Sequence, residues 1–214
     1  VWTADRELYL ETWTLLAGII AQHPAAANSA IIVQGRHDWI SEALNAPAGR
    51  LADHLFDELS WNEGPDTLTE SLRERSQILL ALPPDPQAHA AAQLAMRANW
   101  LYLHDPDWTV KHLVPLIEQG SATDVGEAAI AGFLRQSHFP PNELLLRLKP
   151  LMLALFANEQ SMSRRHDNLQ SLILASWFRK DAEGNRLLAS DDLREALITT
   201  SESNRLGILR LIAN

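Results

Sequence analysis

The chain has 214 residues, of which 46% are apolar, so it is long enough to fold around a sizeable core; its lack of cysteine excludes disulfide frameworks and thiolate metal sites. Its formal net charge of −9 argues against binding nucleic acid through the phosphates, because that mode of binding needs a basic surface. No apolar run approaches the roughly 18 residues of a membrane span and no stretch has the pattern of a secretion signal, so we expect a cytoplasmic protein without a membrane partner.

Helical spacing of apolar residues covers most of the first 82 residues. The pattern begins at once and Val1 is not an initiator methionine, so we expect a piece of a longer chain. Residues 26–34 are interpreted as helix, although Ile31–Val33 could form a short strand, because no partner strand is evident. A capping box, Thr67 with Glu70, opens the last helix of this part. The spacing predicts helices over residues 3–22, 26–34, 37–44, 47–61 and 67–82.

Residues 85–119 read as a helical hairpin closed by the turn at 105–107. Asp85 is predicted to cap the first helix, with Pro86 at its first position. That helix carries a stripe of small residues that would let a neighbouring helix approach closely, namely Ala91, Ala95, Ala98 and Tyr102. The second helix has a buried face at i, i+3, i+4 and i+7, formed by Val110, Leu113, Val114 and Ile117.

The rest of the chain continues the helical pattern, with predicted helices over residues 123–136, 141–157, 161–180, 190–199 and 204–212. Pro150 should kink the leucine-rich helix, Ser190 should cap the next-to-last helix, and Ser201 or Ser203 the last, which has no evident partner in this chain. Ser121, Ser161 and Ser201 are 40 residues apart, the size of a HEAT-like unit.

The predicted fold is therefore all-α, built of stacked antiparallel helical hairpins, either as a HEAT-like repeat or as an irregular helical bundle. We expect an N-terminal helical subdomain over residues 1–82 and helical-hairpin repeats over residues 83–214, packed together as one unit.

Two groups of polar residues are candidates for a metal-binding or catalytic site. His104, Asp105, Asp107 and His112 flank one turn and could converge on a metal, but Asp107 is also well placed to cap the following helix. His54 and Asp57 lie three apart on one predicted helix and could form a general base, but without a nucleophile motif a surface pair is the better interpretation. We therefore assign no catalytic, cofactor-binding or metal residue.

Other features have structural explanations. The seven tryptophans are predicted to pack in the core with satisfied indole N–H groups. The local basic positions 164–165, 205 and 210 are interpreted as solvated helix faces.

Three segments taken in order carry a resemblance: ALNAPAGRLA at 43–52; WLY at 100–102 with DPDWT at 105–109 and LVPL at 113–116; and GFL at 132–134 with EL at 143–144 and LKP at 148–150. Together they resemble the helical C-terminal region of large bacterial sirtuin-like proteins associated with defence against phage. The resemblance spans about residues 5–212. It implies a non-catalytic region that assembles or senses, next to an N-terminal domain that consumes NAD. None of its residues matches the sirtuin nucleotide site, so no cofactor is assigned.

The leading hypothesis is a non-catalytic helical scaffold or sensor. It would bind a protein partner, namely the absent N-terminal domain of the same polypeptide or a phage protein. The alternatives are a general helical-repeat adaptor unrelated to defence, and a metal-dependent enzyme using His104, Asp107 and His112.

Overall fold

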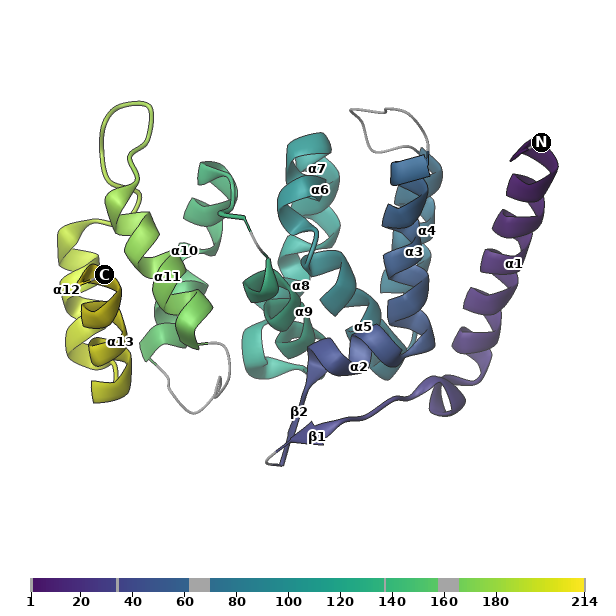
Figure 1. The fold of residues 1–214 in the computed structure, drawn as a ribbon, viewed down its shortest axis with the longest axis horizontal. Helices are drawn as coiled ribbons and strands as arrows, with labels where there is room; N and C mark the ends of the chain where they lie inside the picture. The colour runs from purple at the N-terminus through teal and green to yellow at the C-terminus, as the bar shows by residue number, and fades with distance from the viewer. Residues whose placement is uncertain (1, 34, 62–69, 137, 158–165, 214) are drawn as a thin grey trace. The chain divides into compact units, whose positions relative to one another are not determined.

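The computed structural model describes residues 2–33, 35–61, 70–136, 138–157 and 166–213 (Figure 1). That part of the chain forms thirteen α-helices, two short 3-10 turns and one small β-hairpin, which confirms the all-α prediction. The helices group into two compact units, residues 1–133 and 134–214. The boundary expected between residues 82 and 83 therefore falls inside the first unit. None of the described helices is both long and apolar enough to cross a bilayer.

The first unit contains most of the helices. Its elements are α1 (Trp2–Gln22), η1 (Pro24–Ala27), β1 (Ile32–Val33), β2 (Arg36–His37), α2 (Trp39–Asn45), α3 (Pro47–Trp61), α4 (Glu70–Leu80), α5 (Pro84–Ala95), α6 (Ala98–His104), α7 (Pro106–His112), α8 (Val114–Glu118), η2 (Gly120–Ala122) and α9 (Asp124–Arg135), which runs across the boundary. The capping box expected at Thr67 lies outside the described residues.

The segment between α1 and α2 corrects the prediction of helix over residues 26–34. After the 3-10 turn η1 the chain extends, and β1 pairs antiparallel with β2. Gly35 adopts a φ of +76°, the left-handed conformation that a tight reversal requires and that glycine takes without a steric penalty. The β-branched residues Ile32 and Val33 therefore form a strand. Its partner strand, Arg36–His37, is too short to be recognised from the sequence. Figure 1 shows this extended segment carrying the chain from the end of α1 to the start of α2.

The hairpin predicted over residues 85–119 is divided more finely, into four helices. The break between α7 and α8 has a physical reason, because Pro115 has no N–H to donate to the preceding turn. Asp85 does not cap α5, as had been expected: Pro83 is the N-cap residue, and Asp85 lies in the first turn, where a carboxylate is favoured by the helix dipole. The small-residue stripe is confirmed for Ala91, Ala95 and Ala98, which are fully buried, while Tyr102 is half-buried.

Two glycines allow one α-helix to touch the backbone of another α-helix in the first unit. A Cβ atom at Gly49 in α3 would lie 1.9 Å from the carbonyl oxygen of Ala43 in α2. A Cβ atom at Gly132 in α9 would lie 2.0 Å from the carbonyl oxygen of Ala92 in α5. Both distances are far below van der Waals contact, so only glycine fits at these positions.

The second unit is built from α10 (Asn142–Ala157), α11 (His166–Phe178), α12 (Ser190–Thr199) and α13 (Glu202–Ala213). Pro150 lies inside α10, as expected. Ser201 accepts a hydrogen bond from the backbone N–H of Asn204 at 3.2 Å and so caps α13, which confirms one of the two predicted caps. Ser190 does not cap α12, because its hydroxyl accepts a hydrogen bond from the Trp177 indole at 3.1 Å instead.

The last helix has a partner in this chain, contrary to expectation. α13 packs on α11, and Asn204 donates to the carbonyl oxygen of Phe156 at 3.1 Å while it accepts from Gln170 at 3.0 Å. Thr200 also donates to the Phe156 carbonyl oxygen, so the end of α10 is satisfied by side chains from the α12–α13 junction. The 40-residue spacing of serines stays a prediction, since Ser161 lies outside the described residues.

Replacing Gly132 with alanine should destabilise the protein by about 1–3 kcal/mol, because the new methyl group must push α9 away from the backbone of α5. The matched control is Gly18→Ala in α1, where a Cβ would meet nothing within 4 Å, and helix propensity predicts a gain of up to about 1 kcal/mol. Urea denaturation measures both free energies of unfolding. Equal stability of the two variants would contradict the close contact.

Candidate functional site

The turn at residues 104–107 is a helix cap in the structure. Asp105 lies between α6 and α7 and accepts a hydrogen bond from the backbone N–H of Trp108 at 3.0 Å, so Asp105 is the cap and not Asp107 as had been expected. Its other carboxylate oxygen accepts from Nε of Arg73 in α4 at 2.6 Å. The turn is thereby tied to α4, and Asp107 is left exposed.

The two histidines of this turn are engaged separately. His104 donates from Nδ1 to the carbonyl oxygen of Trp100 at 2.8 Å and stacks on the Trp100 ring. His112 lies 3.4 Å from the side-chain amide of Gln77. No three His, Asp or Glu side chains within the described ranges are grouped to hold a metal ion.

His54 and Asp57 form the expected surface pair. Their side chains are 3.2 Å apart and both are about half exposed.

The tryptophans follow the prediction in part. Trp13, Trp39 and Trp108 are buried, and the Trp13 indole donates to the carbonyl oxygen of Leu51 at 3.3 Å. The indole N–H groups of Trp39 and Trp108 have no hydrogen-bond partner among the described residues, contrary to expectation.

A buried carboxylate that the sequence analysis did not single out lies at the start of α2. Glu42 has an exposed fraction of 0% and accepts hydrogen bonds from three donors. These are the backbone N–H of Ile31 at 2.9 Å, Nδ1 of His37 at 2.9 Å and Nε2 of His89 at 3.3 Å. Burying a carboxylate is costly unless donors surround it, so these contacts fix the strand segment and α5 against α2. The only sequence signal was the short spacing of His37 and Glu42.

The environment of His89 disfavours its charge. Burial lowers the pKa of His89 below its ordinary value, and His37 lowers it further, while Glu42 and Asp85 act in the opposite direction. His89 donates from Nε2 to the carboxylate, and its Nδ1 has no partner among the described residues, as suits a neutral imidazole. Burial also lowers the pKa of His112, with Lys111 adding to the effect and Asp105 opposing it.

An apolar groove lies between α1, η1 and α3 in the first unit, and it is the candidate site. Its volume is about 370 Å³, within the range of ligand-binding clefts. The walls are mostly aliphatic, with Leu16 and Ile19 from α1, Ala27 from η1 and Leu51 from α3.

Three basic side chains border this groove: His23, Arg50 and His54. Arg50 is exposed and forms no ion pair or side-chain hydrogen bond with any residue that the structure describes. The groove therefore combines apolar walls with an exposed guanidinium at its edge, in a chain whose net charge is −9.

The outer face of α1 adds further apolar surface beside the groove. Leu8 and Leu15, outside the lining, are 64% and 65% exposed, and the lining residues Leu16 and Ile19 are 43% and 46% exposed. Figure 1 shows α1 running alongside α3.

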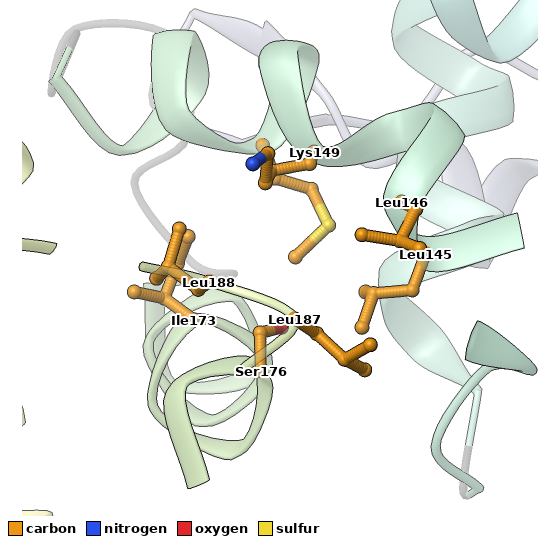
Figure 2. Close-up of a pocket in the computed structure, with 8 residues that line it drawn as sticks. Leu145, Leu146, Lys149, Ile173, Ser176, Leu187 and Leu188 are labelled. Atoms are coloured by element: carbon orange, nitrogen blue, oxygen red, sulfur yellow. The ribbon is translucent and has the colours of Figure 1, made fainter. Parts of the chain in front are cut away.

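The cavity in the second unit is not a ligand site. Figure 2 shows Leu145, Leu146 and Lys149 of α10 facing Ile173 and Leu188 across a narrow space. Its volume is about 10 Å³, room for a single water at most. Lys149 is held beside it by an ion pair with Asp192 at 3.1 Å.

No protein-family model, curated protein or solved structure matches this chain.

The His89 environment predicts a loss of stability in mild acid. Because its folded-state pKa lies below its unfolded value of 6.5, the unfolded chain binds more protons, and stability falls as the pH drops through about 6.5 towards the folded value. The slope contributed by one histidine is at most about 1.4 kcal/mol per pH unit. His89→Gln keeps a donor for Glu42 and should flatten this slope. Urea denaturation between pH 5 and 8 measures it, and an unchanged slope would be the contrary result.

Proposed function

We propose that this chain is a non-catalytic helical interaction module that binds an amphipathic, acidic α-helix of a protein partner in the groove between α1 and α3. The observation that carries the proposal is the combination of an aliphatic groove of about 370 Å³ with the guanidinium of Arg50 at its edge, which has no ion-pair partner among the residues that the structure describes. Contiguous exposed apolar surface is typical of interaction sites.

The shape of the groove favours a helix as the occupant. It is bordered by two helices, α1 and α3, so a third helix can lay an apolar stripe between them and complete a small bundle. The exposed Leu15 and Ile19 would then be covered by the same partner. Anchors of the partner would be residues spaced i, i+3, i+4 and i+7.

The charges favour acidic residues beside that stripe. Arg50 has no carboxylate partner within the described part of the chain, and His23 and His54 also border the groove. A partner carboxylate would pair with Arg50, which would increase the affinity. The remaining surface of this acidic chain would repel the carboxylate, so the partner helix would bind in one orientation. From the resemblance to sirtuin-like defence proteins we further propose that such a helix belongs to an N-terminal domain of the same polypeptide or to a phage protein.

A displayed library of random helical peptides, selected on the purified protein, tests the proposal. Enriched peptides should show an apolar stripe flanked by Asp or Glu. Their affinity, measured by calorimetry, should fall at least about tenfold in Ile19→Asp, because the new carboxylate lies on the groove floor. Ile198→Asp in α12 is the matched control, since Ile198 is an exposed isoleucine in the other unit and its change should leave affinity unaltered.

Charge reversal sharpens the test. Arg50→Glu should weaken binding of an acidic peptide and restore binding of the same peptide with lysine in place of the acidic residue. Peptides that bind Ile19→Asp and wild type equally, or a library that yields no enriched peptide, would count against the groove.

A further inference from the structure

The chain after α11 forms a short antiparallel reversal in the second unit. The backbone N–H of Leu187 donates to the carbonyl oxygen of Arg179 at 3.1 Å, and that of Asp181 to Asn185 at 2.8 Å. Lys180 and Arg186 lie between these bonds as an antiparallel bridge. They are therefore the non-hydrogen-bonded pair, in which opposed side chains share one face and approach most closely.

This pair places two positive charges on one face of the reversal. Neither Lys180 nor Arg186 forms an ion pair with a carboxylate anywhere in the described ranges. The adjacent Asp181 projects from the opposite face by strand alternation, and its carboxylate accepts from the backbone N–H of Asn185 at 2.8 Å. Like charges directly opposed in a strand pair are destabilising, so an anion between them would be favoured.

The guanidinium of Arg186 is already positioned. It lies over the Trp177 ring, 4.3 Å from the centroid, and donates from one Nη to the Trp177 carbonyl oxygen. The indole is fixed in turn by its hydrogen bond to Ser190 at 3.1 Å. These contacts leave the other N–H groups of Arg186 available, with little conformational entropy to lose on binding.

We propose that Lys180 and Arg186 form an anion-binding site for a phosphate monoester dianion. Two cations match the charge of this group, and its three terminal oxygens can accept from the guanidinium fork and the ammonium at once. This site is independent of the groove between α1 and α3. Its ligand is a phosphate group, carried by a phosphoserine of a protein or supplied as free inorganic phosphate.

The test is a titration of the intact protein with inorganic phosphate at constant ionic strength, followed by the ¹H–¹⁵N signal of the Trp177 indole. The wild type should show a saturable shift, and its Tm should rise by about 3 °C at tenfold excess over Kd. Lys180→Ala should bind phosphate at least about tenfold more weakly. In chloride alone its Tm should rise by about 1–3 °C, because repulsion is relieved. Arg186→Gln should also lose binding.

The control is Arg205→Ala, which removes an exposed arginine of α13 that likewise has no ion-pair partner among the described residues and should keep the phosphate response. A short acetylated phosphoserine peptide and its unphosphorylated form identify the source. Tenfold tighter binding of the phosphopeptide assigns the site to a modified protein, and equal affinity assigns it to free phosphate. An equal phosphate response in wild type and Lys180→Ala overturns the proposal, as does a response lost equally in Arg205→Ala.

Discussion

The first unit depends on one buried carboxylate. Glu42 is shielded from water, so hydrogen bonds must replace its lost hydration. Ile31, His37 and His89 donate these hydrogen bonds. Two of these donors lie on the extended segment between α1 and α2, which has little secondary structure of its own. Glu42 therefore holds this segment on α2 and α5, and with it the turn η1, whose Ala26 and Ala27 form one wall of the groove. The hydrogen bonds of one buried carboxylate therefore help to hold a wall of the proposed binding groove in place.

The second constraint is direct contact between helix backbones at glycine positions. Gly49 and Gly132 bring backbones into contact, so α3 and α9 lie against α2 and α5 at distances that any Cβ would prevent. This arrangement buries the alanine-rich face of α5 completely, while Leu8, Leu15 and Ile19 of α1 stay exposed. Exposed leucines and isoleucines such as those of α1 form the kind of contiguous apolar surface on which the proposed interaction rests.

The sequence predicted the features that depend on neighbouring residues. Pro47 starts α3, and the spacing of small and apolar residues locates the buried faces of α5 and α8, because these signals act within a few positions. It could not predict the burial of Glu42, whose partner His89 is 47 residues away. The same limit applies to Ser190, whose hydroxyl was expected at a helix cap but serves the Trp177 indole. Whether Arg50 finds a carboxylate is likewise decided by packing between helices, so the groove had no local signature.

Hydrogen–deuterium exchange of the backbone amides in residues 26–37, compared between wild type and Glu42→Ala, tests the central role of this carboxylate most directly. The Ile31 amide is protected in the wild type by its bond to Glu42, so the variant should exchange much faster throughout this segment, while α10 and α11 in the other unit exchange as before. Unchanged exchange at residues 26–37 in Glu42→Ala would show that the segment is held by other contacts and would contradict the account.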